Sequence, residues 1–297
     1  MAETTDYEAR RSAFGRKSFA ERQQTHDEIA AAKREAMAAR VELGRTYLAQ
    51  HGNGITVPHD RAVAVVELVE ETRAARDEAV ALLDGRTAGI DNGALQFPVL
   101  GHEFAADGPV IGLATQPLLL APVVRYFGMM PILFNAFVTR AHQEELKENS
   151  PHRFHLDPED TISFKLFVHL TDVDEDCGPF HALPADRTQT VLDAVDYRGV
   201  TMLDDAAVAD LVGWDAVVAV TGPAGTVALA DTTRCLHFGG RPRAAGKPVR
   251  EMVVIQYLLP TSVILVGEHA DSPRRFMSQL EPTGDDAWDA LLGATHT

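Results

Sequence analysis

Short segments with the composition of β-strands follow one another from residue 131 onward, and they constrain the fold more than any other feature. Each is rich in β-branched and aromatic residues and is bounded by turns rich in Gly, Pro or Asp. Strands are predicted at residues 131–141, 162–170, 217–220, 226–230 and 251–259. Short helices are predicted after Gln116-Pro117 and at residues 204–211. Many strands without alternating long helices predict a mainly β fold with flanking helices (α+β), a sandwich or jelly roll and not a Rossmann sheet.

The first 90 residues have a helical composition instead. Residues 19–50 are rich in Ala, Glu, Arg and Gln and stop at a His-Gly-Asn-Gly stretch, which predicts a helix. A second helix is predicted at residues 60–84, with Asp60 as its N-cap and Gly85 at its end. We therefore expect residues 1–90 to form a helical N-terminal extension packed on a β core at residues 91–297, as one structural unit. Two roles stay open for the extension, a cover over the core and a homodimer interface.

The charge and cysteine content narrow the classes of partner. A net charge of −16 in 297 residues disfavours nucleic acid and anionic membranes, because both select basic surfaces. The charged N-terminus lacks the apolar stretch of a signal peptide, and the most apolar run, residues 117–124, is too short to cross a bilayer. Cys177 and Cys235 are too few for a disulfide framework and too far apart for a Cys-x-x-Cys site. We expect a cytoplasmic protein that acts on a small molecule.

His-x-acid pairs are the motif in this sequence that most suggests a chemical function, but each pair must be judged by its position in the predicted fold. With 12 histidines and 43 acidic residues in 297 positions, about two such pairs are expected by chance. Four occur, at His26/Glu28, His142/Glu144, His155/Asp157 and His269/Asp271. The first lies in a predicted helix, where residues two apart diverge. The second lies in a charged loop-like segment, and the last is too near the C-terminus for another core strand to follow it.

His155 and Asp157 stand in the favourable context, and His237 completes the set. The pair directly precedes a predicted strand, and residues two apart on extended chain point to the same side. His237 ends a later strand-like segment. Two imidazoles and one carboxylate are the ligand set of non-haem iron(II) oxygenases, which leave three coordination positions open. The alternative is a structural divalent ion, which needs a fourth ligand that the sequence does not clearly supply.

Two cations near these residues suggest an anionic ligand. Arg250 opens a strongly apolar strand, where its guanidinium could pair bidentately with a carboxylate inside a barrel. The alternative for Arg250 is an exposed ion pair at a strand end; its neighbours Arg241 and Arg243 lie in a Gly- and Pro-rich turn nearer solvent. Lys165 shares one strand face with Phe167 and His169, which predicts either a polar cavity or a solvent-facing edge strand.

Three segments in order resemble the phytanoyl-CoA dioxygenase (PhyH-like) family. They are FHLDPEDTISFKLFVHLTDVDEDCGPFHALP, GPAGTVALADTTRCLHFGGRPR and VREMVVIQY, within residues 150–260. Members of that family are iron(II)- and 2-oxoglutarate-dependent oxygenases built on a double-stranded β-helix (a cupin-like jelly roll). The resemblance implies that His155, Asp157 and His237 bind Fe(II), and that Arg250 pairs with the distal carboxylate of 2-oxoglutarate. It also implies that Lys165 contacts this cosubstrate, and it supplies no catalytic residue beyond the metal ligands.

The resemblance further implies a hydroxylase-type dioxygenase that uses O2 and converts 2-oxoglutarate to succinate and CO2. Related halogenases have Gly or Ala in place of the ligand carboxylate, whereas this chain has Asp157. Family members often have a Pro-Gly-Ser-His turn where this chain has Leu-Pro-Ala-Asp-Arg at residues 183–187. The residue usage, typical of a high-GC bacterium, favours a specialised metabolite as the small organic substrate. The alternatives are a non-catalytic metal-binding β-barrel protein and a non-haem iron oxygenase without 2-oxoglutarate, which would not need Arg250.

Overall fold

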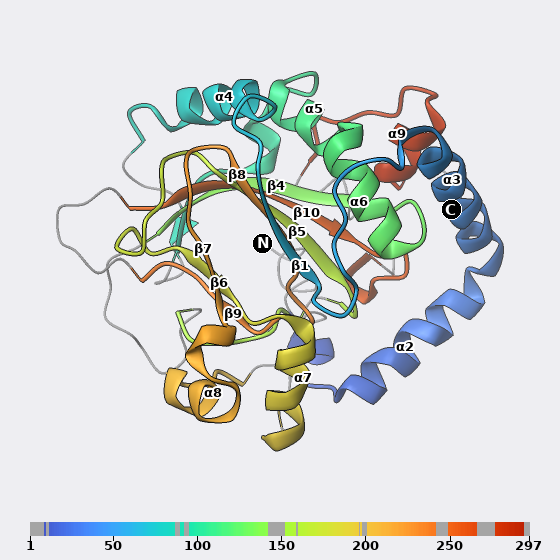
Figure 1. Cartoon of the computed structure of the whole chain (residues 1–297). Helices are drawn as coiled ribbons and strands as arrows, with labels where there is room; N and C mark the ends of the chain where they lie inside the picture. Colours follow the sequence, from blue (N-terminus) through green and yellow to red (C-terminus); the bar gives the residue numbers. More distant parts are fainter. Residues whose placement is uncertain are drawn as a thin grey trace.

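The structure is a computed structural model of the chain. It describes residues 9, 12–86, 90–91, 95–141, 152–158, 160–195, 197, 201–241, 249–265 and 277–293. Within these ranges the chain forms two antiparallel sheets, with helices on their outer sides (Figure 1). The architecture is therefore a mixture of helix and antiparallel sheet, as the sequence predicts.

The larger sheet has seven strands and carries most of the core. Its order is β1 (Val63–Glu67), β8 (Thr226–Asp231), β5 (Ser163–His169), β10 (Glu251–Leu258), β4 (Ile132–Ala141), β3 (Leu95–Val99) and β2 (Ile90–Asp91). Strand β5 lies between β8 and β10, and both faces of these strands are buried. Because β10 connects β5 to β4, residues far apart in sequence lie side by side on the inner face.

The smaller sheet faces the larger one across the interior. It has the order β7 (Val218–Val220), β6 (Phe180–Ala182) and β9 (His237–Phe238). The rings of Phe167 on β5 and Phe180 on β6 stack with their centroids 4.2 Å apart. This contact joins the facing sides of the two sheets, whose strands β5 and β6 are labelled in Figure 1.

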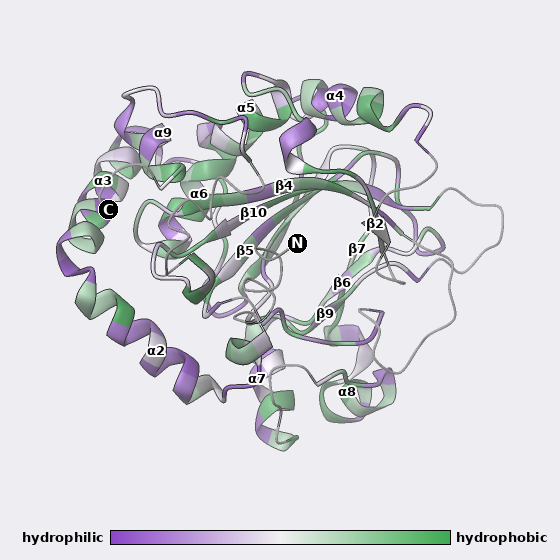
Figure 2. Cartoon of the chain, turned by 180° about the vertical axis from the view of Figure 1, so that it is seen from behind, coloured by the Kyte–Doolittle hydropathy of each residue, from purple (hydrophilic) through white to green (hydrophobic). Residues whose placement is uncertain are grey.

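Helices cover the outer faces of the sheets. They are α2 (Phe19–Ala32), α3 (Arg34–His51), α4 (Arg73–Leu83), α5 (Pro109–Thr115), α6 (Pro117–Phe127), α7 (Ala185–Ala194), α8 (Asp205–Val212) and α9 (Asp286–Leu291), with 3₁₀ turns at Gly101–Glu103, Trp214–Ala216 and Val263–Leu265. Helices α4, α5 and α6 lie on the large-sheet side, and α7 and α8 lie beside the small sheet. Figure 2 shows apolar colours along α6, which is largely buried, and mostly hydrophilic colours along α2.

Arg40 of α3 ties the N-terminal helices to the rest of the molecule. Its buried guanidinium donates hydrogen bonds to the carbonyl oxygens of Met130 (3.1 Å), Pro131 (3.4 Å) and Ala290 (2.8 Å). These acceptors precede β4 and end α9, so one side chain joins segments from three parts of the sequence. Burial lowers the pKa of Arg40 to about 10, which leaves the group charged at neutral pH.

The strand predictions from residue 131 onward are confirmed to within one residue at most ends, and α6 and α8 lie where short helices are predicted. The predicted helix at residues 60–84 is wrong in its first half. Residues 63–67 form β1 at the edge of the large sheet, and helix α4 begins only at Arg73. Val63, Val65 and Val66 favour extended chain, and their pairing with β8 decides the outcome.

The long helix predicted at residues 19–50 is two helices, which meet at Lys33. Ser18 caps α2, and the side chain of Glu21 accepts a hydrogen bond from the Ser18 backbone. In the described ranges, no single helix is long and apolar enough to cross a membrane. The bent pair α5–α6 passes that test jointly, by length and composition.

Candidate metal centre

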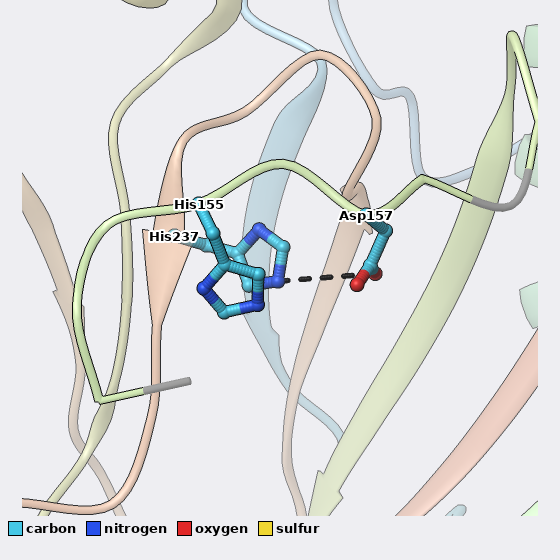
Figure 3. Close-up of side chains that lie close together, drawn as sticks. All are labelled: His155, Asp157 and His237. Carbon is cyan, nitrogen blue, oxygen red and sulfur yellow. Dashed lines mark ion pairs between the residues drawn. The ribbon is translucent and has the colours of Figure 1, made fainter. Parts of the chain in front are cut away.

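His155, Asp157 and His237 converge at one point, and Figure 3 shows their side chains pointing toward one another. One ligand atom of each lies within 4.8 Å of the others. Nε2 of His237 is 3.8 Å from Oδ2 of Asp157, the pair joined by the dashed line. Asp157 and His237 are buried and His155 is partly exposed, so the cluster is open on the His155 side.

Main-chain hydrogen bonds fix the spacing of the three residues. His155 and His237 form an isolated antiparallel bridge, in which each backbone N–H donates to the carbonyl of the other at 3.0 Å. The backbone N–H of Asp157 donates to the carbonyl of Thr232 just beyond β8 (2.9 Å). The pair therefore precedes β5, as the sequence predicts, and is not itself part of a regular strand. The bridge ends at His155, and Asp157 is placed by its own contact with the next segment.

Each histidine ring is oriented by a carbonyl oxygen close behind it. Nδ1 of His155 lies 2.8 Å from the carbonyl oxygen of Arg153, and Nδ1 of His237 lies 3.0 Å from that of Cys235. A carbonyl only accepts, so Nδ1 is the donor in both contacts, and Nε2 is the nitrogen of each ring that points away from the carbonyl. Both rings are thus held in the tautomer that binds a metal through Nε2.

The electrostatics of His237 and Asp157 favour the binding of a cation. Burial lowers the pKa of His237 to about 3, reinforced by His155, so this ring is neutral at physiological pH. Burial by itself would raise the pKa of Asp157, but the charge of Lys165 and its hydrogen bond hold the pKa of this carboxyl well below the usual range. Two imidazole nitrogens and one carboxylate oxygen suit a divalent first-row metal ion.

Lys165 of β5 belongs to the same cluster. Its Nζ lies 2.6 Å from Oδ2 of Asp157, and both side chains are largely shielded from solvent. Because β5 lies inside the large sheet, the alternative of a solvent-facing edge for Lys165 is wrong. The structure thus places this cation against the carboxylate of the triad; its contact with a cosubstrate stays a prediction.

Arg250 lies just before β10 and is 2% exposed. Nη1 of Arg250 contacts Sδ of Met252 at 3.1 Å, and its Nε has no hydrogen-bond partner. No carboxylate of the described residues forms an ion pair with the Arg250 guanidinium. Burial lowers its pKa to about 10, so it stays charged at neutral pH. A side chain at Gly239 would bring a Cβ within 3.1 Å of the guanidinium, so the glycine leaves room there. The exposed ion pair considered for Arg250 is wrong, and a buried cation of this kind calls for an anionic ligand.

The other candidate residues from the sequence are paired elsewhere, lie outside the metal cluster, or fall outside the described residues. Arg241 donates to Asp205 at 2.6 Å and lies over the ring of Phe238, so it is already paired. His26 and Glu28 lie on α2. Neither belongs to the three-residue cluster of the described residues that could hold a metal. The pairs His142/Glu144 and His269/Asp271, and Arg243, lie outside the described residues.

Sequence reasoning missed two polar groups near the centre. The hydroxyl of Tyr197 accepts a hydrogen bond from the backbone of Leu156, between the first two residues of the triad (2.9 Å). Gln256 lies opposite Lys165 in the sheet and donates to Oγ of Ser163 at 2.9 Å. Gln256 could have been noticed as the one amide in the apolar segment EMVVIQYLL, but nothing local points to Tyr197.

No protein-family model matches this chain, and no curated protein matches it by sequence. Solved structures resemble it remotely. EctD from S. alaskensis in its apoform is 16% identical over 68% of this chain and 74% of its own, with a TM-score of 0.47. The non-heme alpha ketoglutarate dependent epimerase SnoN from nogalamycin biosynthesis is 17% identical over 84% and 95%, with a TM-score of 0.47. HygX from Streptomyces hygroscopicus, with nickel and 2-oxoglutarate bound, is 17% identical over 67% and 83%, with a TM-score of 0.44. Likenesses this remote carry no weight for function.

Proposed function

We propose that this chain is an Fe(II)- and 2-oxoglutarate-dependent oxygenase of the PhyH-like family. His155, Asp157 and His237 would hold the iron, and Arg250 would hold the distal carboxylate of 2-oxoglutarate. The observation that carries the proposal is the combination of an oriented two-histidine, one-carboxylate cluster with a buried, unpaired guanidinium in the same interior. The two facing antiparallel sheets support the finer expectation of a double-stranded β-helix core.

With iron, 2-oxoglutarate and O2 bound, the centre would supply the oxidising power for hydroxylation of a small organic substrate, with succinate and CO2 as coproducts. The chain's own contribution is binding and orientation. The carbonyls of Arg153 and Cys235 keep both Nε2 lone pairs available, and Lys165 keeps Asp157 ionised. The stacked rings of Phe167 and Phe180 are buried and pack against each other between the sheets.

Two finer points belong to the same proposal. Asp157 fills the position of the third ligand, which supports hydroxylation over halogenation, where that ligand is absent. A specialised metabolite as substrate and a cytoplasmic location are the expectations from residue usage and from the N-terminal sequence. Lys165, next to Asp157, is proposed to contact the cosubstrate as well as the ligand carboxylate.

Spectroscopy of the anaerobic protein tests the proposal. Iron(II) and 2-oxoglutarate together should produce a weak visible charge-transfer band, which Asp157→Ala and His237→Ala should abolish and His26→Ala should leave intact. Succinate should form once oxygen is admitted with a substrate. A wild-type protein that shows no band and makes no succinate would show that it is not this type of oxygenase.

The same measurements distinguish the two alternatives. A non-catalytic metal-binding protein would bind iron but show no response to 2-oxoglutarate. A non-haem iron oxygenase without this cosubstrate would oxidise a substrate equally well after Arg250→Ala. The burial of an unpaired Arg250 favours the 2-oxoglutarate enzyme over both, because neither alternative accounts for that charge.

A further inference from the structure

Strand register places more polar groups around Arg250 than the sequence resemblance assigns. Met252, which touches the guanidinium, lies directly opposite His169 of β5 on one side and Thr139 of β4 on the other. Residues directly opposite in an antiparallel sheet have side chains on the same face. Thr226 of β8 follows next to His169, since Val227 pairs with Val168. We refer to Arg250, His169, Thr139 and Thr226 as the carboxylate cradle.

The polar atoms of the carboxylate cradle are buried without partners. Thr139 Oγ1, Thr226 Oγ1, Arg250 Nε and both ring nitrogens of His169 form no hydrogen bond of good geometry with the described residues. His169 and Thr226 are at most 1% exposed, and Thr139 is 3% exposed. A buried polar atom left unpaired costs about 1–3 kcal/mol, so several such side chains on one face of neighbouring strands indicate a bound polar ligand.

The cradle offers donors and a single positive charge. Burial lowers the pKa of His169 to about 4, and the charge of Arg250 acts in the same direction, against the nearby carbonyl of Gly222. The ring is therefore neutral at physiological pH, with one N–H to donate and no second charge. A guanidinium, an imidazole N–H and the hydroxyl of Thr139 are complementary to one carboxylate, whereas Thr226 lies on the far side of His169 and three strands away from Thr139.

We propose that His169 and Thr139 donate hydrogen bonds to the distal carboxylate of the cosubstrate beside Arg250, so that the cradle as a whole selects a dicarboxylate. This inference rests on the proposed function, because it takes 2-oxoglutarate as the ligand. It assigns a direct contact to His169. In the sequence, His169 stands out only as a strand residue that faces the same side as Lys165.

Binding to nickel(II)-loaded protein, measured by calorimetry without turnover, tests the inference. The two probes are 2-oxoglutarate and pyruvate, which shares the ketoacid end but lacks the distal carboxylate. His169→Leu should bind 2-oxoglutarate about tenfold to a hundredfold more weakly, as expected for a lost hydrogen bond to a charged group, and bind pyruvate as wild type does. His169→Gln, which keeps an N–H donor, should recover part of the loss.

A matched control is His181→Leu. His181 is also a buried histidine, but it lies on the small sheet, stacked on Phe238, and it should leave both affinities unchanged. Thr139→Val is nearly isosteric and gives the same comparison if the His169 variant does not fold. It should weaken 2-oxoglutarate alone by about tenfold.

The outcomes separate this inference from the proposed function. If wild-type protein binds 2-oxoglutarate no better than pyruvate, both are wrong. If wild type prefers 2-oxoglutarate, and Arg250→Ala loses that preference while His169→Leu and Thr139→Val keep it, the inference is overturned and the proposed function stands. Loss of the preference in the His169 and Thr139 variants, with pyruvate binding intact, supports the cradle.

Discussion

The ammonium group of Lys165 lies 2.6 Å from Oδ2 of Asp157, so a cation of the protein itself compensates the carboxylate of the proposed metal site. A buried carboxylate without a counter-charge is costly, and Lys165 supplies one from the neighbouring strand. The pair therefore links the stability of the metal-free fold to the electrostatics of the site.

Lys165→Met should destabilise the metal-free protein and increase its response to metal. Removing one member of a shielded ion pair costs about 3 kcal/mol, because the other charge is left uncompensated. A bound divalent ion restores the compensation, so the rise in melting temperature on adding nickel(II) should be larger than in wild type. Thermal unfolding with and without metal measures both effects. Exposed Lys33→Met is the control, and equal metal responses in the two variants would contradict the role given to Lys165.

Arg250→Ala should separate metal binding from cosubstrate binding. Metal-loaded wild type should gain about 2.7 kcal/mol of stability at a 2-oxoglutarate concentration a hundred times its Kd. The variant should keep the stabilisation by metal and lose that by 2-oxoglutarate. The comparison is Arg241→Ala, whose guanidinium is paired with Asp205, and which should keep both responses. A full 2-oxoglutarate response in Arg250→Ala would mean that the anion binds elsewhere.

Asp160 should make the stability of the protein depend on pH near neutrality. Burial raises the pKa of Asp160 to about 7 from 3.8, against the hydrogen bond from the backbone of Thr161. Because the folded state holds this proton more tightly, its contribution is fully present below about pH 4 and is lost as pH rises through 7. The loss is at most about 4 kcal/mol.

Asp160→Asn removes that dependence. Its melting temperature should exceed that of wild type by more at pH 8 than at pH 5, and exposed Asp193→Asn should show no such trend. Differential scanning calorimetry across this range gives the comparison. A constant difference between wild type and Asp160→Asn would mean that the buried carboxyl does not titrate there.

Arg40→Met should destabilise the whole chain in one step. The substitution removes the hydrogen bonds of Arg40 to the carbonyls of Met130, Pro131 and Ala290, at a cost of about 3 kcal/mol. We expect a single unfolding transition in wild type and variant alike, which tests whether the N-terminal helices and the β core form one structural unit. Arg45→Met, which breaks an exposed pair with Glu42, should change stability by less than about 1 kcal/mol. Two separate transitions would show that the extension folds independently.

Local signals explain which elements could be predicted from the sequence. The segments that become β4, β5, β8 and β10 are apolar, β-branched and bounded by turn residues, so their neighbours in sequence suffice. The strand β1 could not be predicted from its neighbours in sequence, because its conformation depends on pairing with β8, more than 150 residues later. Apolar residues recur at mixed three- and four-residue intervals along residues 60–84, which suits a helix until that pairing is known.

The features of the candidate site also fall into those that the sequence predicts and those that depend on non-local pairing. His155, Asp157, His237 and Arg250 could be selected by spacing and resemblance, but spacing does not contain the main-chain geometry that places Asp157 off a strand. Thr139 and His169 lie opposite Met252, two residues after Arg250, only because of the register of β4 and β5 with β10, so no single segment predicts that they are neighbours. Non-local pairings of this kind leave no trace in any one segment.

The reciprocal backbone hydrogen bonds between His155 and His237 have a consequence for protein engineering. The separation of these two residues is set by peptide groups, which every amino acid possesses, and not by the side chains that surround them. Under the proposed function, an engineer seeking a new substrate could therefore exchange neighbouring side chains while the two proposed metal ligands stay in register. The same freedom does not extend to the main chain at positions 155 and 237.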